Sequence, residues 1–434
     1  MQTNQRRRVV VLGLDGVPLE LLRTLSQQGV TPNLARIALS GHVASMRVEL
    51  PELSPVNWTS FATGAGPETH GVFGFTRIDP ATYSIAITDA TAVRTPTIFD
   101  ALGERGLTSR VVNLPNTYPA RPMRGMMVAG FVAPELSRAV FPPFLAGQLA
   151  GMGYRLEADT VRGKDDPEVL LAELSATLDS RLAALDLFWR DLAWDAFVFV
   201  LTETDRLFHF LYPALEDAEH PLHTPCRELM RQLDRVAGAL LERFDALPEP
   251  KRLLVMADHG FTALETEVDM NSWLMAHGFL QMERQPLSEL DATCIGAASR
   301  AFALDPGRIY LHTAERFGRG RLLPADALRV REELRTMLLD MRYKGRPVLR
   351  AVHLREELYN GPLSASAPDL VCEPMPGMSL TAKFDGREVF GFHGRRGTHT
   401  ADGAVVYDSL GRPAASPRDV GQQVLDFFGA RTQY

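Results

Sequence analysis

The sequence predicts an α/β protein with a mainly parallel central sheet that helices cover. Short apolar runs alternate with segments of helical period from Arg8 to Met256, which is typical of such a sheet. Three of the strongest apolar runs are followed by acidic residues or histidine, at Asp15, Glu203 and Asp258. In open parallel sheets ligands bind at the carboxyl ends of the strands, so these three endings indicate one shared site.

The chain is long enough for one large core with insertions. The apolar runs predict buried strands, and an amphipathic stretch predicts a helix over 166–194. We expect a catalytic core of residues 1–261 and 368–434, with a loop and helix insertion at about 135–194 and an insertion or cap over 262–367. The predicted strands are 8–14, 108–113, 125–132, 196–201 and 252–256, followed near the end of the chain by 368–371 and 404–407.

Composition excludes several classes of protein. The 434 residues are 45% hydrophobic and 23% charged, a globular balance that argues against disordered, collagen-like and coiled-coil chains. The net charge of -7 provides no sequence-wide basic surface, so we expect no stable nucleic-acid partner. The three cysteines are widely spaced and form no CxxC motif, which favours a reducing, cytoplasmic location. The apolar run after Arg8 is too short for a signal peptide, and no stretch reaches the ~20 apolar residues of a membrane span.

Asp258, His259 and Gly260 follow the predicted strand 252–256. An adjacent carboxylate and imidazole on a tight turn can bind one divalent cation. Taken by itself, the tripeptide is better explained as a polar turn. Asp15 ends the first strand and completes a set of three ligands. Three protein ligands with an open position are typical of a catalytic metal site.

Asp205 and His209 are four residues apart in TETDRLFH. On a helix that begins after Leu201 they share one face and can bind a second cation, unless Asp205 only caps that helix. The third ligand is His393 or His399 in FHGRRGTH. Imidazole with carboxylate suits Zn, with Mn or Fe as alternatives. Two such ions roughly 3.5 to 4 Å apart would stabilise the attacking and leaving oxygens of a displacement at phosphorus.

Ser54 is the candidate nucleophile. It precedes a short helix predicted over 57–63, and Gly64 ends that helix. A hydroxyl near a helix N-terminus lies where backbone N–H groups and the helix dipole favour an alkoxide. The simpler alternative is that Ser54 only caps the helix.

The ordered set VVVLGLDG, SPVNWTSFATGAGPETHGVFGF, TETDRLFH, ADHGF and GTH resembles the alkaline phosphatase superfamily. Within it, the chain is similar to the type I phosphodiesterase/nucleotide pyrophosphatase branch and its bacterial phosphohydrolase and phosphomutase-like relatives. The resemblance covers essentially the whole chain. It implies an α/β/α sandwich, two metal ions and a hydroxyl nucleophile that is transiently phosphorylated. It also implies Ser54 as that nucleophile, Asp15, Asp258 and His259 as the ligands on its side, and Asp205, His209 and His399 as those on the leaving-group side.

Two departures from the family pattern bear on specificity. Nucleotide pyrophosphatases carry an Asn where this chain has Phe75, which weakens the expectation of a nucleotide substrate. Classical alkaline phosphatases have a third-metal Glu where this chain has Val200, so we expect two ions. Positive or polar groups must still bind the nonbridging oxygens, and the candidates are Asn57, Arg206, Lys383, Arg395 and Arg396. Four aromatic residues are candidates for stacking on a substrate, namely Trp58, Phe73, Phe75 and Phe131.

We therefore predict a two-metal phosphoric-ester hydrolase, a phosphodiesterase or phosphomonoesterase, acting on a small-molecule phosphate ester through a phosphoserine. The alternatives are a phosphotransferase or phosphomutase, or a phosphonate or sulfate-ester hydrolase, on the same core. A catalytically silent metal-binding protein is disfavoured because both ligand sets and a hydroxyl occur together.

Overall fold

The computed structural model describes residues 6–163 and 165–431. The chain forms two compact units: unit 1 comprises Met1–Gly66, Asp89–Thr262 and His399–Tyr434, and unit 2 comprises Pro67–Thr88 and Ala263–Thr398. These bounds differ from the expected division, because residues 67–88 and 368–398 belong to unit 2. The strand expected at 368–371 is β17 (Leu370–Pro374), which pairs with strands of unit 2 and not with the large sheet.

Unit 1 contains an eight-stranded sheet in the order β2-β21-β9-β1-β8-β5-β6-β7. The five strands from β9 to β6 run parallel. β21 pairs antiparallel with β9, the edge strand β2 pairs antiparallel with β21, and the other edge strand β7 pairs antiparallel with β6. This sheet confirms the predicted α/β class with a mainly parallel central sheet. Its strands are β1 (Arg8–Leu14), β2 (Val43–Met46), β5 (Ser109–Leu114), β6 (Gly125–Ala129), β7 (Val140–Phe141), β8 (Ala196–Leu201), β9 (Lys251–Met256) and β21 (Ala404–Asp408).

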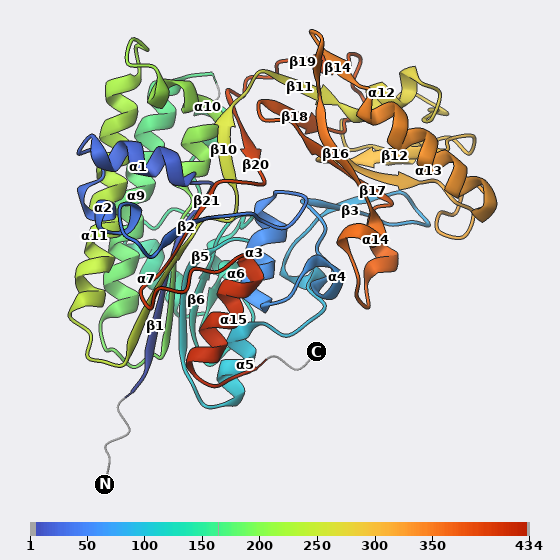
Figure 1. Cartoon of the computed structure of the whole chain (residues 1–434). Coiled ribbons are helices and arrows are strands. Elements are labelled where there is room, and N and C mark those ends of the chain that lie inside the picture. Colours follow the sequence, from blue (N-terminus) through green and yellow to red (C-terminus); the bar gives the residue numbers. More distant parts are fainter. Residues whose placement is uncertain (1–5, 164, 432–434) are drawn as a thin grey trace. The chain divides into compact units, whose positions relative to one another are not determined.

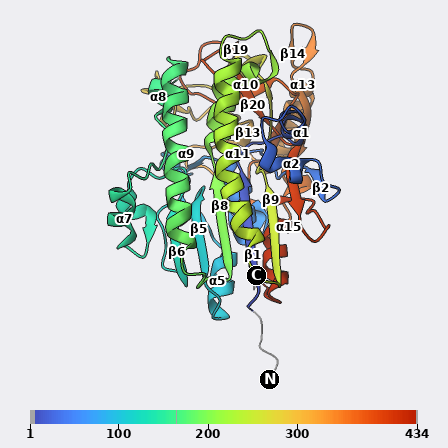
Figure 2. The ribbon, with the colours of Figure 1, turned by 90° about the vertical axis from the view of Figure 1, so that its left-hand side faces the viewer.

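Helices cover both faces of this sheet (Figures 1 and 2). Because neither face meets water, the central strands are continuous apolar runs without alternation, and every residue of β1 and β8 is buried. One layer contains α9 (Pro167–Trp189), α10 (Glu203–Glu216) and α11 (His223–Asp245), and the other contains α3 (Ser54–Thr63), α5 (Ile98–Glu104) and α15 (Pro417–Phe427). The shorter helices of unit 1 are α1 (Leu19–Gln27), α2 (Pro32–Ala38), η1 (Ala90–Ala92), α6 (Leu136–Ala139), α7 (Leu145–Gly151) and α8 (Thr160–Gly163).

The predicted helix over 166–194 is α9, which has an N-terminal cap encoded in the sequence. The Asp166 carboxylate accepts hydrogen bonds from the backbone N–H groups of Glu168 and Val169, and Pro167 occupies the first helical position. Leu170, Leu174 and other apolar residues of α9 are buried. This helix is therefore part of the helical layer that covers the sheet.

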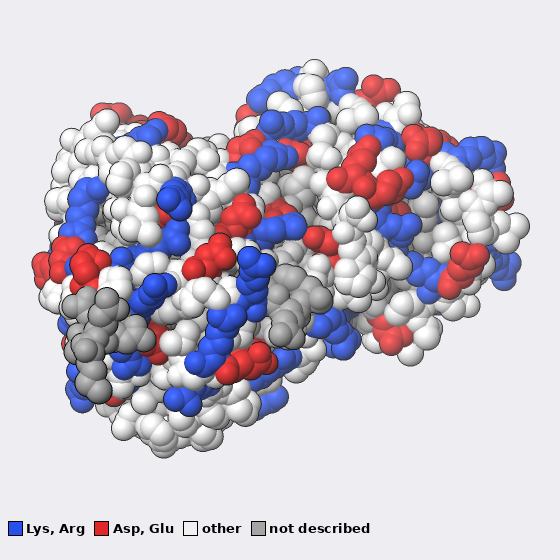
Figure 3. Space-filling model, turned by 60° about the horizontal axis from the view of Figure 1, so that its bottom comes forward, with Lys and Arg blue, Asp and Glu red and all other residues white. Residues whose placement is uncertain are grey.

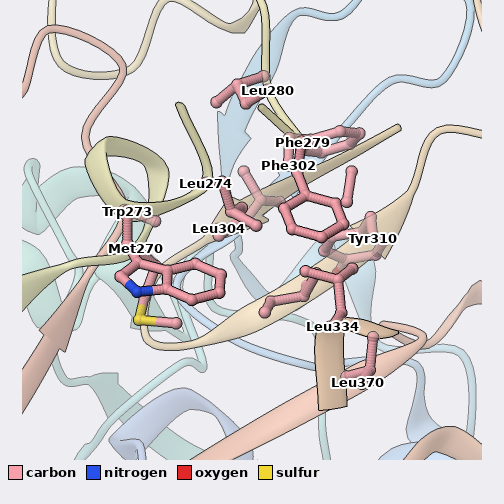
Figure 4. Packing of buried hydrophobic residues seen from close by; sticks show 14 of the residues in the cluster. Met270, Trp273, Leu274, Phe279, Leu280, Phe302, Leu304, Tyr310, Leu334 and Leu370 are labelled. Carbon is pink, nitrogen blue, oxygen red and sulfur yellow. The ribbon is translucent and has the colours of Figure 1, made fainter. Parts of the chain in front are cut away.

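Unit 2 is built round its own apolar core (Figure 4). Aromatic and aliphatic side chains pack together in the part shown, where Trp273, Phe279, Phe302 and Tyr310 lie with Leu334. Its helices are α4 (Pro67–His70), α12 (Met270–Ala276), η2 (Ala292–Cys294), α13 (Pro324–Leu339), α14 (Arg355–Leu358) and η3 (Ser364–Ser366). Its strands are β3 (Thr76–Ile78), β4 (Ile85–Ile87), β11 (Thr266–Asp269), β12 (Ala301–Leu304), β13 (Arg308–Leu311), β14 (Arg342–Tyr343), β15 (Arg346–Pro347), β16 (Leu349–Leu354), β17, β18 (Met378–Thr381) and β19 (Phe390–Gly391). The remaining pair is β10 (Gly260–Ala263) with β20 (Gly397–Thr400).

Basic and acidic side chains are interspersed on the face drawn in Figure 3. This mixture agrees with the slightly acidic composition of the chain. Among the described residues, no helix has both the length and the apolar character needed to cross a membrane.

Candidate active site

The candidate active site of unit 1 lies at the carboxyl ends of three adjacent strands. β1 lies between β8 and β9 in the sheet, so Asp15, Asp205 and Asp258 come from neighbouring strand ends, Asp205 through the first turn of α10. The parallel order of these strands is what brings residues so distant in sequence to one edge.

The first set of potential ligands contains Asp15, Asp258 and His259. One ligand atom from each lies within 4.8 Å of the others. His259 Nε2 is 3.7 Å from Asp15 Oδ1 and 3.4 Å from Asp258 Oδ2. All three side chains are buried. An isolated polar turn would not bury two carboxylates beside one imidazole without a counter-charge.

The second set contains Asp205, His209 and His399. Asp205 Oδ1 is 3.3 Å from His209 Nε2 and 3.2 Å from His399 Nε2, and the two imidazole Nε2 atoms are 3.0 Å apart. Asp205 and His209 share one face of α10, as their spacing predicts. Asp205 does not cap the helix, because Thr202 occupies the N-cap position.

The two sets adjoin each other through His259. Its Nε2 is 3.8 Å from Asp205 Oδ1, and its ring stacks on that of His399 with 3.6 Å between centroids. Two cations bound by these sets would therefore be neighbours, as a two-metal site requires.

Each of the three aspartates uses one carboxylate oxygen for a hydrogen bond that orients it. The Trp58 indole N–H donates to Asp15 Oδ2 at 3.2 Å. The Gly16 backbone N–H donates to Asp258 Oδ1 at 3.1 Å, and Arg206 Nη1 donates to Asp205 Oδ2 at 2.6 Å. The other oxygens of Asp15 and Asp258 are buried without a hydrogen-bond partner. Buried carboxylate oxygens of this kind fit a metal ion as the missing partner.

Two of the histidines have their second ring nitrogen fixed by a backbone carbonyl. His259 Nδ1–H donates to Gly260 O at 3.0 Å, and His399 Nδ1–H donates to Glu52 O at 2.9 Å. This tautomer leaves the Nε2 lone pair toward the cluster, which is how metal-binding histidines are commonly oriented. The donor sets therefore fit two divalent cations.

The charges of the cluster perturb its ionisation in the metal-free state. Burial, together with the charges of Asp258 and Asp205, holds the pKa of Asp15 well above its usual value. Burial would also raise the pKa of Asp205, but His209, His399 and Arg206 outweigh burial and lower that pKa well below its usual value. Burial and the neighbouring His259 lower the pKa of His399 to about 3. Three carboxylates crowded in this way favour a cation between them.

Ser54 is the first residue of α3, and its hydroxyl faces the first ligand set. Ser54 Oγ is 3.3 Å from His259 Nε2, and the side chain is buried. Leu53 occupies the N-cap position and no side chain caps the helix, so the alternative that Ser54 only caps α3 does not describe this structure. The helix begins three residues earlier than the sequence predicts, because Pro55 is well accommodated in a first turn.

The remaining predicted residues are placed differently. Asn57 is completely buried, and its amide bonds the backbone of Glu49 and Leu53, so both ends of the amide are occupied. Phe75 and Lys383 belong to unit 2, where Lys383 Nζ lies 3.1 Å from Glu289 Oε2. Their roles in substrate binding stay predictions.

The structure gathers His399 rather than His393 into the second set. The His393 side chain is 55% exposed, and its Nε2 lies 3.7 Å from Glu267 Oε2. His399 belongs to β20 and donates to the loop that leads into α3, which positions its ring.

Sequence reasoning missed several orienting groups. Trp58 is completely buried and bonds Asp15, so it is not available to stack on a substrate as its type suggested. Thr204 Oγ1 donates to the backbone carbonyl of Asp15 at 2.6 Å. Such residues have no motif of their own. The only available signal was that Trp58 lies in the predicted helix four residues after Ser54, and that Thr204 lies directly before Asp205.

The sequence model of the type I phosphodiesterase / nucleotide pyrophosphatase family matches residues 9–399. The chain therefore belongs to this family, as its motifs predicted. Among solved structures, it is similar to phosphonoacetate hydrolase from Sinorhizobium meliloti 1021, with a TM-score of 0.66, 18% identity, and coverage of 96% of this chain and 95% of that chain. It is also similar to murine ectonucleotide pyrophosphatase / phosphodiesterase 5, with a TM-score of 0.58, 12% identity, and coverage of 98% and 96%. The human form of the latter protein gives a TM-score of 0.55, 14% identity, and coverage of 98% and 96%.

Proposed function

We propose that this protein is a two-metal phosphoric-ester hydrolase that acts through a phosphoserine at Ser54. One observation carries the proposal: two adjoining ligand sets lie beside a serine hydroxyl, with Ser54 Oγ 3.3 Å from His259 Nε2. Membership of a family of phosphodiesterases and pyrophosphatases supports the reaction class.

Asp15, Asp258 and His259 would hold one cation, and Asp205, His209 and His399 the other. Zn suits these donors, with Mn or Fe as alternatives. When bound, such a pair of ions lowers the pKa of a hydroxyl and of a water molecule and neutralises charge on phosphoryl oxygens.

The chain itself positions the reacting hydroxyl. Ser54 Oγ loses its proton and attacks phosphorus, the bond between phosphorus and the leaving oxygen breaks, and the departing oxygen takes up a proton. Water then attacks the phosphorus of the modified serine, and the bond between phosphorus and Oγ breaks. This step releases phosphate from a monoester substrate or a phosphate monoester from a diester, and Oγ regains its proton. Because Ser54 is only 5% exposed, little free water surrounds Oγ before substrate binds, which preserves its nucleophilicity.

The test is Ser54→Ala, with Ser60→Ala on the same helix as the matched control. We expect Ser54→Ala to lower kcat by roughly three orders of magnitude or more while the bound metal is retained. Ser60→Ala should keep wild-type turnover. Wild-type kcat in Ser54→Ala would remove Ser54 from its proposed role.

The substrate class follows from a comparison of kcat/KM values in the presence of Zn or Mn. The panel comprises aryl phosphomonoesters, phosphodiesters, phosphonates and sulfate esters. We expect a phosphorus ester to be the best substrate, because two cations suit the charge of a phosphoryl group. A sulfate ester as the best substrate would contradict this expectation. An added alcohol that captures the phosphoryl group would favour the phosphotransferase alternative.

We also propose a cytoplasmic location. It is supported by Cys226, Cys294 and Cys372, which are all buried and free of disulfides.

A further inference from the structure

Arg206 is a largely shielded cation, with a side chain 15% exposed, directly beside the second ligand set. It follows Asp205 in the first turn of α10. Its Nη1 donates to Asp205 Oδ2 at 2.6 Å, and its Nε donates to Glu157 Oε2 at 3.1 Å. The guanidinium carbon lies 4.1 Å from the centroid of the Phe131 ring. Three contacts from three parts of unit 1 therefore fix one planar group.

Because Arg206 binds only one oxygen of the Asp205 carboxylate, the two oxygens have different contacts. Oδ2 accepts from Arg206, whereas Oδ1 faces His209 at 3.3 Å and His399 at 3.2 Å. A charge-assisted hydrogen bond from a rigid guanidinium restricts rotation of the carboxylate. The same oxygen is thus always presented to the cluster.

We propose that Arg206 is a positioning residue for the cation that Asp205, His209 and His399 would hold. This inference rests on the proposed function, because it assumes that the second ligand set binds a metal. Arg206 would favour that ion through orientation and not through its charge, since two cations repel each other. Glu157 offsets the charge of Arg206 and keeps its Nε engaged.

The geometry requires an arginine and not merely a positive charge. Arg206 uses Nη1 and Nε at once and stacks on Phe131, which a lysine ammonium on a flexible chain cannot reproduce. Arg206→Lys should therefore behave as a partial loss and Arg206→Met as a full loss of orientation. Glu157→Gln should give a smaller loss, because it loosens Arg206 without removing its bond to Asp205.

The experiment is a Zn titration of the metal-stripped full chain against a chromophoric chelator. For the wild type we expect two bound ions. In Arg206→Met we expect one ion to keep its wild-type affinity and the other to bind about 10- to 100-fold more weakly, the usual effect of losing a group that orients a metal ligand. Arg36→Met is the matched control: Arg36 is a surface arginine paired with Asp245, and both affinities should stay unchanged.

Each result has a distinct meaning. Wild-type affinity for both ions in Arg206→Met would overturn the inference, and a raised KM in that variant would instead assign Arg206 to substrate. An equal loss at both ions would show a general disruption and would also overturn it. If Arg206→Met does not fold, Arg206→Lys and Glu157→Gln must weaken one ion selectively for the inference to stand. Fewer than two ions in the wild type would refute the proposed function itself.

Discussion

Replacing Asp15 with asparagine should raise the stability of the metal-free protein and reduce the stability that bound metal adds. Asp15 is 3% exposed, and burial and the charges of Asp258 and Asp205 raise its pKa well above the usual value. Without metal, the folded state therefore disfavours the ionised form of Asp15, which lowers the stability of the protein near neutral pH. Asparagine keeps the shape and an oxygen that can accept from Trp58, but it carries no charge.

The expected changes in the free energy of unfolding can be worked out separately for the metal-free and the Zn-bound protein. Burying an ion costs several kcal/mol in a real protein, and partial relief of that penalty predicts a metal-free Asp15→Asn variant that is roughly 1 to 3 kcal/mol more stable than the wild type. With free Zn at about 100 times the wild-type Kd, one ion adds ~2.7 kcal/mol to the stability of the wild type. If loss of the carboxylate weakens that ion about 100-fold, its contribution falls to ~0.4 kcal/mol.

The assay is equilibrium urea unfolding near neutral pH, with a chelator or with buffered Zn. The comparison uses the unfolding transition whose midpoint shifts when metal is added. If the urea dependence of the free energy of unfolding is the same in both variants, a change in the midpoint urea concentration reports a change in stability. Asp245→Asn is the matched control, because Asp245 lies on the surface and pairs with Arg36. It should change neither value by more than about 0.5 kcal/mol.

Two outcomes would refute this reasoning. A metal-free Asp15→Asn variant no more stable than the wild type would show that the neighbouring carboxylates do not destabilise Asp15. An unchanged gain of stability from Zn would show that Asp15 is not a ligand.

Three further predictions concern other parts of unit 1. Burial lowers the pKa of His399 in the folded state to about 3 from 6.5; the unfolded state therefore binds the proton first, and stability present above pH 6.5 is lost as the pH falls toward 3. Urea unfolding should show a loss of roughly 2 kcal/mol between about pH 6.5 and 5 in the metal-free wild type, and a smaller loss in His399→Gln. Trp58→Phe keeps an aromatic ring but removes the N–H that donates to Asp15, so Zn titration should show one ion bound about 10- to 100-fold more weakly. A Cβ at Gly13 would lie 2.6 Å from the Trp58 ring and 2.9 Å from Val200, so urea unfolding should show that Gly13→Ala destabilises the protein by about 1 to 3 kcal/mol.

These predictions have separate controls and separate contradictions. Gly41→Ala is the control for Gly13→Ala, because a Cβ at Gly41 would have no atom within 4 Å; it should leave stability nearly unchanged. Equal stability of Gly13→Ala and the wild type would contradict the tight packing of β1. Parallel pH profiles for His399→Gln and the wild type would contradict the assignment of the titration to His399. Two wild-type Zn affinities in Trp58→Phe would show that the indole does not orient Asp15.

Much of unit 1 could be predicted from the sequence because its signals are local. The strands β1 and β8 match their predicted bounds, since a strand buried on both faces is a continuous apolar run. Asp205 and His209 lie on one helical face because the helical period requires it. Asp15 and Asp258 meet because both end parallel strands.

Other features depend on contacts that no local pattern encodes. The strand near residue 370 was predicted correctly as a strand, but its partners β13 and β16 lie elsewhere in the chain and place it in unit 2. Asn57 has a chemistry that suits a phosphoryl oxygen, yet the backbone of the segment before α3 takes both ends of its amide. The orienting role of Trp58 depends on a hydrogen bond across 43 positions of sequence.

The central claim is that Ser54 becomes phosphorylated during turnover. Acid quenching of the metal-loaded protein during steady-state turnover of an aryl phosphate, followed by peptide mapping, measures this directly. We expect a single phosphoryl group on the peptide that contains Ser54, and none when the same peptide carries alanine at this position. A phosphoryl group on another residue would contradict the proposed mechanism. So would an unmodified chain during rapid turnover, when hydrolysis of the phosphoserine limits the rate.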